Sequence, residues 1–366
     1  MNRKNFLSSI LTAGAVIPHL GASASNTPTR HTSTGSYPGH IDPAHPGHHD
    51  PALPSGQLPL LVPAYLRPGD TIGITCPAGF ITSKEIKPSV ELIESWGFKI
   101  KVGDTVDKKD FTFGGTDAER LADFQKMLDD PEVKAILCAR GGYGAVHIVD
   151  RLDFSGLNQH PKWVIGFSDI TVLLCHLHNN LNIASIHSKM CNSFPDDWTK
   201  AEPVQVECIL SIRQALSGEK MQYNVPPHEK NRTGTAEGPL VGGNLKTIET
   251  LAGTHSDIDT TGKILFVEDT GEYLYSIDRM FWNLQRTGKL SGLHGLIIGG
   301  FKVKPDDPGD EYGRTLYDIV QERIKPYDYP VCFEFPVGHQ KNNVALKYGI
   351  PHILTVQQAQ VQLIEK

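Results

Sequence analysis

Apolar and polar positions along the chain change their period several times after residue 70. Short apolar runs typical of buried strands alternate with longer segments whose apolar residues recur at the spacing of one helix face. This alternation predicts parallel strands joined by crossover helices. Thr116 and Glu119 form a T-x-x-E capping box, which predicts the start of one helix. The predicted strands are residues 70–78, 99–103, 133–140 and 163–167, and the predicted helices are residues 84–98, 117–130 and a further one between 140 and 163.

The second half of the chain shows the same alternation and ends in a different pattern. Its last residues, 349–366, alternate as a pair of β-strands does. Before them, the predicted strands are residues 263–269, 295–300 and 329–335, and the predicted helices are residues 276–288 and 317–324.

These patterns predict two domains, since a chain of 366 residues exceeds the size of one ordinary core. We expect an α/β domain with a parallel sheet at residues 63–220. A polar segment at residues 221–237 is the predicted interdomain linker, and residues 238–366 form the predicted second domain.

The first 62 residues carry two further patterns. Residues 1–25 combine a basic start, an apolar stretch and the small residues "ASA", which predicts an export signal and a periplasmic location. The apolar stretch is shorter than the roughly 20 residues of a membrane span, so we expect no stable membrane insertion. Residues 26–62 are rich in Pro, Gly, Ser, Thr and His and predict a disordered linker. The linker histidines suggest a metal site as an alternative, without acidic or cysteine partners at fixed spacing: His40, His45, His48 and His49.

Composition narrows the function classes. Hydrophobic residues make up 39% of the chain and charged residues 21%, as in folded globular proteins. A net charge of −6 without a dense Lys/Arg run argues against a nucleic-acid partner. The six cysteines form no C-x-x-C pair, so neither a zinc nor a redox motif appears. We expect no metal and no cofactor.

Ser168 follows a predicted strand, in the segment WVIGFSDIT. Ligands of doubly wound sheets bind beyond the carboxyl ends of the strands. A serine at such a turn lies beside helix amides that would stabilise negative charge. The G-x-S-x-G pattern of a nucleophile elbow is incomplete here, because Ile170 stands at its last position. On these residues alone, Ser168 or Asp169 as a helix N-cap is the competing interpretation.

The segment RGGYG follows another predicted strand end. It matches no phosphate-binding glycine motif, and a tight turn is the alternative. Because a glycine backbone can approach a ligand closely, the N–H groups of Gly142 and Asp169 are candidate oxyanion donors. Arg140 is a candidate for binding a substrate carboxylate, with a structural salt bridge as its alternative.

The second domain supplies an acid and an imidazole at strand ends. Glu268 and Asp269 end the run ILFVED, and His339 follows a glycine in FPVGH. A serine nucleophile needs a base, and the base needs a group that orients it. Exposed polar loops are the alternative for both segments. Asn244 in VGGNL is either a pocket residue or a turn residue.

Five segments in one order resemble the LD-carboxypeptidase family of serine peptidases, which includes muramoyl-tetrapeptide carboxypeptidases and microcin C immunity peptidases. The resemblance spans about residues 63 to 360 and favours Ser168 as a nucleophile over an N-cap. The segments are ARGGYGAVHIVDRLDF, VIGFSDIT, GPLVGGNL, ILFVEDTGEYLYSIDRM and FPVGH.

The resemblance implies a catalytic triad of Ser168, Glu268 and His339. It also implies a flavodoxin-like or Rossmann-like N-terminal domain, a smaller β-rich C-terminal domain, an active site between them, and a homodimer. The segment SIHSKM departs from a His-Gly-Pro-Met-like run that is frequent in the family, so the pocket wall near His187 and Met190 is expected to differ.

The function that follows is release of terminal D-alanine from murein tetrapeptides. Cleavage of a peptidyl-nucleotide amide is the alternative within the family, and the predicted export signal favours murein. A non-catalytic periplasmic peptide-binding protein is the alternative from another class, since two lobes around a groove would serve it too. A metallohydrolase that uses the histidine-rich linker is a third.

Overall fold

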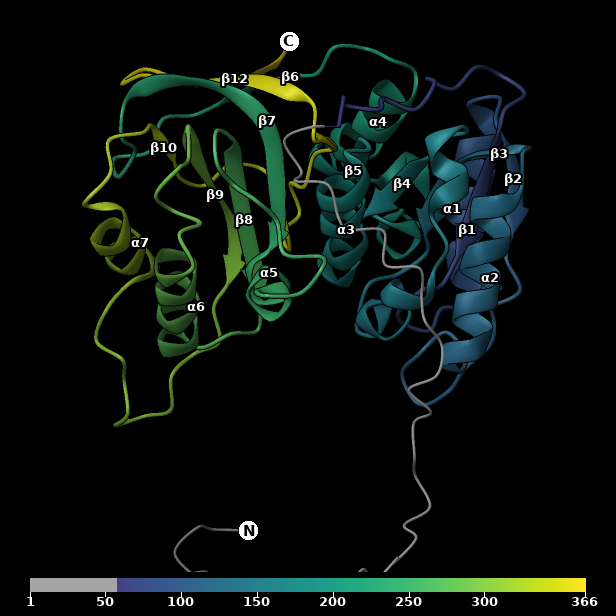
Figure 1. The fold of residues 1–366 in the computed structure, drawn as a ribbon, viewed down its shortest axis with the longest axis horizontal. Coiled ribbons are helices and arrows are strands. Elements are labelled where there is room, and N and C mark those ends of the chain that lie inside the picture. Colours follow the sequence, from purple (N-terminus) through teal and green to yellow (C-terminus); the bar gives the residue numbers. More distant parts are fainter. Residues whose placement is uncertain (1–57) are drawn as a thin grey trace, which may run out of the picture. The chain divides into compact units, whose positions relative to one another are not determined.

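A computed structural model describes residues 58–366 (Figure 1), and two sheets in this range belong to one compact unit of the chain. The predicted export signal at residues 1–25 and most of the predicted linker lie outside the described residues. The end of that linker is paired, because the N–H of Leu61 donates to the carbonyl of Asn182 at 2.9 Å.

The first sheet is built from the predicted strand–helix alternation and has six strands in the order β11-β5-β4-β3-β1-β2. Five strands are parallel, and β11, which comes from the far end of the chain, is antiparallel to β5. Its strands are β1 (Thr71–Thr75), β2 (Lys99–Val102), β3 (Val133–Cys138), β4 (Trp163–Gly166), β5 (Ser185–His187) and β11 (Leu346–Tyr348).

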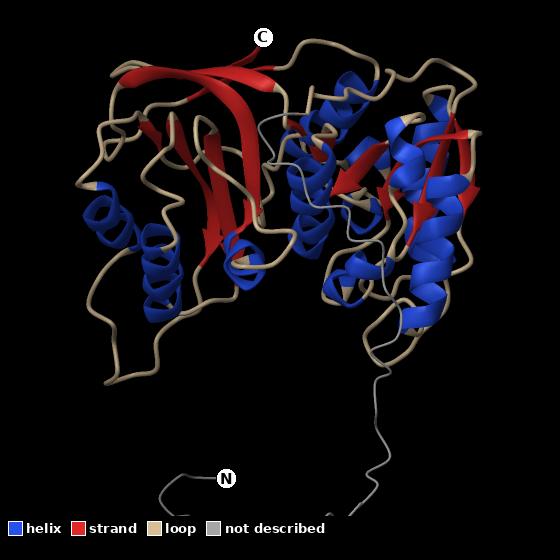
Figure 2. Cartoon of the chain, in the orientation of Figure 1, coloured by secondary structure: helices blue, strands red, loops and turns tan. Residues whose placement is uncertain are grey.

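Helices cover both faces of this sheet (Figure 2). Along β3, Leu137 belongs to one core cluster with residues of α1 and α4, whereas Ile136 belongs to a second cluster with residues of α2 and α3. This alternation explains why both faces of the strand carry buried apolar residues after the exposed Lys134. The helices are α1 (Ser83–Ser95), α2 (Asp117–Asp129), α3 (Thr171–Leu181) and α4 (Pro203–Leu216).

Two local predictions have different outcomes. The capping box of Thr116 and Glu119 at the start of α2 is confirmed, with both reciprocal hydrogen bonds present. The helix predicted between residues 140 and 163 is wrong, since three short 3-10 helices occupy the segment: Ala145–His147, Val149–Arg151 and Ser155–Asn158. Extended backbone at Leu152 interrupts them, so no run is long enough for an α-helix.

The second sheet has seven strands in the order β10-β9-β8-β7-β12-β13-β6. Its first four strands are parallel, and the chain ends in the predicted pair of strands, which the structure shows to be antiparallel. Its strands are β6 (Gln222–Val225), β7 (Gly234–Asn244), β8 (Ile264–Thr270), β9 (Gly295–Lys302), β10 (Val331–Cys332), β12 (Pro351–Val356) and β13 (Val361–Glu365), and its helices are α5 (Leu245–Leu251), α6 (Leu274–Arg286) and α7 (Leu316–Ile324).

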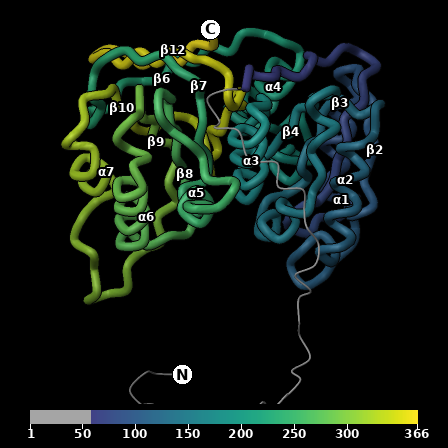
Figure 3. The backbone as a smooth tube through the Cα atoms, in the orientation of Figure 1, coloured from purple at the N-terminus to yellow at the C-terminus, as the bar shows by residue number. Residues whose placement is uncertain are grey.

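The mixed α/β architecture with a parallel sheet and a β-rich second part is confirmed. The segment at residues 221–237, for which the sequence predicts a linker, contains β6 and the start of β7. The sequence also places β11 in the second domain, but its strand completes the first sheet. Figure 3 follows this return of the chain in the late, yellow part of the tube.

Helix α3 lies between the two sheets and joins their cores. It contacts β4 and β5 of the first sheet as well as β7 and α5 of the second. One cluster of buried side chains accordingly runs from Phe124 and Leu174 through Leu240 to Ile297. Within residues 58–366, none of the helices has both the length and the apolar character needed to cross a bilayer.

A buried ion pair ties the two sheets together at the side where β11 returns. The ammonium of Lys347 on β11 lies 2.9 Å from a carboxylate oxygen of Glu365 on β13, and both side chains are almost fully buried. The same ammonium donates to the carbonyl of Glu219 and to the hydroxyl of Tyr65. Because these groups are out of water, removal of one partner leaves an uncompensated charge.

We therefore expect Lys347→Met to lower the free energy of unfolding by about 3–5 kcal/mol, as is typical when one partner of a buried pair is removed. Urea denaturation followed by circular dichroism measures the change. The control is Lys87→Met, which removes an exposed pair with Glu91 on α1 and should change stability little. Equal effects of the two variants would contradict a structural role for the buried pair.

Candidate active site

Ser168 lies on a sharp turn between β4 and α3. Its φ of +63° is in the left-handed region, which non-glycine residues seldom adopt. Two glycines make room for the turn. A Cβ on Gly166 would lie 2.9 Å from side-chain carbons of Ile170, and a Cβ on Gly141 would lie 2.9 Å from the Cβ of Ser168. The turn therefore has the strained backbone of a nucleophile elbow although the second motif glycine is absent.

Neither candidate for a helix N-cap performs that role. The 3-10 helix η5 (Ser168–Ile170) and α3 both begin without a side-chain capping bond. The carboxylate of Asp169 instead accepts a hydrogen bond from the N–H of Ala145 at 2.8 Å. The structure thus rules out the competing N-cap interpretation of Ser168 and leaves its hydroxyl free for another partner.

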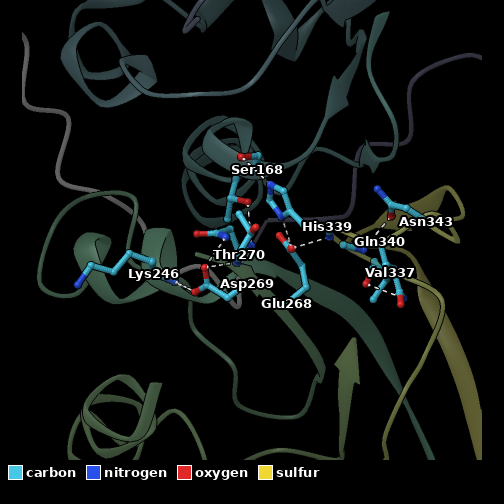
Figure 4. A network of polar contacts seen from close by, with 12 residues as sticks. Ser168, Lys246, Glu268, Asp269, Thr270, Val337, His339, Gln340 and Asn343 are labelled. Carbon is cyan, nitrogen blue, oxygen red and sulfur yellow. Dashed lines mark hydrogen bonds and ion pairs between the residues drawn. The ribbon is translucent and has the colours of Figure 1, made fainter. Parts of the chain in front are cut away.

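That partner is His339, which connects the two sheets (Figure 4). Its Nε2 lies 3.2 Å from the hydroxyl oxygen of Ser168, and its Nδ1 lies 2.5 Å from Oε2 of Glu268. The same carboxylate oxygen accepts the backbone N–H of His339 at 3.1 Å. Glu268 is fully buried, so its contacts orient the ring without competition from water. The three residues predicted to form a triad are in hydrogen-bonding contact.

Glycines allow the loop of His339 to approach β8. A Cβ on Gly338, which has a φ of +101°, would lie only 2.3 Å from the Cβ of Glu268. The N–H of Gly300 on β9 holds the loop by donating to the carbonyl of Val337 at 2.8 Å. The β8–β9 register shifts beside Glu268, as in a bulge. The loop, and not the length of a strand, therefore sets the position of the imidazole.

Gly142 and Asp169 line a pocket that also contains Ser168. Neither amide has a hydrogen-bond partner within residues 58–366. Gly142 has a φ of +102°, which only glycine adopts at low cost. Two unpaired amides beside the nucleophile are what an oxyanion needs.

A buried guanidinium, which the sequence analysis did not identify, fixes the glycine loop. Arg120 on α2 is fully buried and donates to the carbonyls of Gly144 at 2.7 Å and Pro77 at 2.6 Å. The next amide, that of Ala145, donates to Asp169. The peptide group between Gly144 and Ala145 is thus hydrogen-bonded at its carbonyl by Arg120 and at its N–H by Asp169. Burial raises the pKa of Asp169 to about 6, while its bond from Ala145 favours the charged form.

The pocket beside Ser168 has a volume of about 340 Å³ and contains both signs of charge. Asn244 lines this pocket, but its side chain is already hydrogen-bonded. The side-chain oxygen caps α5 by accepting from the N–H of Thr247, and the side-chain NH₂ donates to Asp269 at 3.1 Å. Burial raises the pKa of Asp269 to about 6. Arg140 does not line this pocket, and its guanidinium donates to the carbonyl of Phe80.

His187 and Met190, in the segment predicted to change the pocket wall, are both buried and are absent from the lining of the pocket beside Ser168. Neither ring nitrogen of His187 has a hydrogen-bond partner in the described part of the chain. Its ring packs edge-on against Phe266 at 5.0 Å between centroids. Burial lowers the pKa of His187 to about 3, with a smaller contribution from His339. The imidazole is therefore a neutral packing group behind the site.

The comparisons with known proteins agree with this geometry. Family models described as the LD-carboxypeptidase N-terminal domain and C-terminal domain match residues 72–188 and 237–354. A probable murein peptide carboxypeptidase of Bacillus subtilis is 33% identical over 293 residues, 78% of this chain and 89% of the relative. This chain belongs to the LD-carboxypeptidase family.

Two further members of the family show its range. The crystal structure of muramoyltetrapeptide carboxypeptidase from Oxalobacter formigenes superposes with a TM-score of 0.71 at 26% identity, covering 81% of this chain and 99% of that one. The microcin C7 self-immunity protein of Escherichia coli is 25% identical over 334 residues, 84% of this chain and 96% of the relative. The relatives of this chain thus include one named as a muramoyltetrapeptide carboxypeptidase and one named for microcin C7 self-immunity. No group of three or more potential ligand side chains within residues 58–366 is arranged to hold a metal ion.

The strain at the elbow predicts a difference between two inactive variants. Ser168→Gly and Ser168→Ala both remove the hydroxyl, but only glycine relieves the positive φ. We expect the glycine variant to be more stable by about 1 kcal/mol, the usual cost of a left-handed non-glycine residue. Parallel urea denaturations measure the difference. Equal stability, or a more stable alanine variant, would show that the turn is unstrained in solution.

The buried His187 predicts a pH dependence of stability. The unfolded chain protonates this residue below its ordinary value of 6.5, whereas the folded chain does so only near 3. The free energy of unfolding therefore falls as the pH is lowered through this window, by up to about 1.4 kcal/mol per pH unit. His187→Leu should lose less stability between pH 6.5 and 4 than the wild type. The exposed His160→Leu is the control, and an identical slope for all three proteins would contradict the prediction.

Proposed function

We propose that this protein is a serine carboxypeptidase that removes the terminal D-alanine of murein tetrapeptides. It would hydrolyse the amide that joins this residue to the L-configured centre of the third residue. The contact of His339 with both Ser168 and Glu268 carries the proposal, because a hydroxyl, an oriented base and two free amides make up an acyl-transfer site. The names of the relatives in Bacillus and Oxalobacter support the choice of murein peptides.

In the first step, Nε2 of His339 takes the proton of Ser168 as its oxygen attacks the scissile carbonyl. Glu268 accepts the Nδ1–H, which selects the tautomer with a basic Nε2 and stabilises the imidazolium. The amides of Gly142 and Asp169 bind the oxyanion, where one such donor contributes about 3–4 kcal/mol. His339 then protonates the leaving amine, and water hydrolyses the acyl-enzyme with the same base.

The pocket beside Ser168 suits the acyl part of the substrate. It combines the ammonium of Lys246 with the carboxylates of Asp269 and Glu272 around the nucleophile and the two amides. Opposite charges in one pocket match a third residue such as diaminopimelate, whose side chain carries both an ammonium and a carboxylate. The leaving residue then lies on the other side of the scissile bond.

Cleavage of a peptidyl-nucleotide amide is the second candidate, since a relative named for microcin C7 immunity covers 84% of this chain. The location of the enzyme distinguishes the two substrates, because an exported enzyme meets murein peptides. Export and homodimer formation are also parts of our proposal. Support for export comes from the basic and apolar pattern of residues 1–25, and support for the dimer comes from the family resemblance. The hydrogen bonds of His339 with Ser168 and Glu268 argue against a non-catalytic peptide-binding protein, which would not need them.

The test is turnover of purified tetrapeptides with lysine or diaminopimelate in the third position, followed by mass spectrometry. We expect loss of one alanine, and at least about a 10³-fold lower rate for Ser168→Ala, as in other triad hydrolases. Glu268→Gln should reduce kcat by roughly 10³- to 10⁴-fold, because it favours the wrong imidazole tautomer.

A peptidyl adenylate analogue assayed in parallel distinguishes the second candidate. Faster cleavage of that analogue than of either tetrapeptide would favour the nucleotide substrate. Unchanged tetrapeptide turnover by Ser168→Ala would refute the triad.

A further inference from the structure

A second pocket has His339 and Gln340 in its lining and shares no lining residue with the pocket beside Ser168. In Figure 4, Gln340 lies on the opposite side of His339 from Lys246 and Asp269 of the first pocket. The volume of the second pocket is about 280 Å³, and Ser168 and the two free amides are absent from its lining. Gln340 closes one side, held by hydrogen bonds from its side-chain amide to the carbonyls of Phe335 and Val337. The other lining residues include Lys302 at the end of β9 and Glu334. His339 thus borders the second cavity, and Ser168, which it contacts, borders the first.

The chemistry of acyl transfer assigns different parts of the substrate to these cavities. In the tetrahedral intermediate, the acyl carbon is bonded to Ser168 and its oxygen points at the free amides, all on the side of the first pocket. The leaving nitrogen must face Nε2 of His339 to receive a proton. The residue attached to that nitrogen therefore continues past the imidazole, toward the second pocket.

One lysine in the lining of the second pocket, Lys302, and one behind it, Lys189, have no carboxylate partner among the described residues. The ammonium of Lys302 makes no hydrogen bond or ion pair within residues 58–366. Behind Gln340, the ammonium of the buried Lys189 donates only to the Gln340 carbonyl, at 3.4 Å. Burial lowers the pKa of Lys189, and the positive charge of Lys302 contributes in the same direction. The two cations are therefore close enough to repel each other.

One carboxylate opposes these cations. Glu334 lines the pocket, but its Oε1 accepts a hydrogen bond from the hydroxyl of Tyr317 at 2.6 Å and contacts neither lysine. Within the lining, the charges of Lys302 and Glu334 balance, and the ammonium of Lys189 behind Gln340 adds one positive charge. A cavity with this charge, next to a proton donor, suits a small residue that carries an anion.

We propose that Lys302 binds the free α-carboxylate of the leaving residue in this second pocket. Lys189 adds positive potential behind Gln340. The assignment rests on the proposed carboxypeptidase function and gives it a physical basis: the substrate must end at this residue because its terminal carboxylate is the recognised group. Lys302 takes the role that the sequence analysis gave to Arg140, whose guanidinium lies outside both pockets.

The test compares two peptides with each enzyme variant. One is the tetrapeptide that ends in D-alanine, and the other is the same peptide with a terminal D-alaninamide, which lacks the negative charge. Lys302→Gln should lower kcat/KM for the free acid roughly 10- to 100-fold, the range of a lost hydrogen bond to a charged group, and leave the carboxamide nearly unchanged. Lys302→Glu should reverse the preference, so that the carboxamide is cleaved faster than the acid.

Lys304→Gln is the matched control, because this lysine lies two residues further along and packs over the ring of Tyr273 outside the pocket. Its preference for the free acid should equal that of the wild type. Thermal unfolding verifies that each variant is folded. If Lys302→Gln keeps the preference for the free acid, or loses kcat/KM equally for both peptides, the assignment of Lys302 is wrong. Turnover by the wild type would still support the proposed function in that case. Failure of the wild type to cleave either peptide would refute the proposed function and the assignment with it.

Discussion

The hydrogen-bonded line from Ser168 through His339 to Glu268 depends on two sheets that keep a fixed separation. The serine is attached to the first sheet, whereas the acid and the imidazole belong to the second. A shift of about 1 Å between the sheets would break the 3.2 Å contact of the ring with the hydroxyl. Helix α3 opposes such a shift, because it begins at the nucleophile turn and packs against both sheets. The return of β11 and the buried Lys347 add a second connection.

Missing side chains shape the site as much as present ones. Gly141, Gly166 and Gly338 lie where a Cβ would collide with the serine, the turn or the acid. Because these glycines have no side chain, three chain segments approach one another more closely than they could with any other residue at these positions. The elbow stores strain at a positive φ, and the surrounding core maintains it. Stability is thus given up locally where the chemistry requires an exposed hydroxyl.

The two cavities on either side of His339 give the site a direction. The acyl side offers free amides and charges of both signs, and the leaving-group side offers Lys302, which has no ion-pair partner among the described residues. A peptide can react only when its scissile bond spans the imidazole, so the charge distribution selects the end of the chain as well as the bond. In this arrangement, exopeptidase specificity follows from a few charges placed beyond a general serine-hydrolase triad.

The sequence by itself determined most of the strands and helices, because hydrophobic period and capping residues such as Thr116 are local properties. It predicted an α-helix between residues 140 and 163 and a linker at 221–237, where the structure has short 3-10 helices and strands. Its five ordered motifs, through their resemblance to a known family, also indicated Ser168, Glu268 and His339, which the residues alone offered only as candidates at strand ends. Only the tertiary structure decided what depends on contacts between distant residues. In the structure, β11 pairs with the first sheet and Ser168 is not an N-cap. Arg120 is buried and Lys302 lines the second pocket, although both look like ordinary surface cations in the sequence. Periodicity reports the face that a residue occupies, but the partner on that face is set by the packing of segments far apart in the chain.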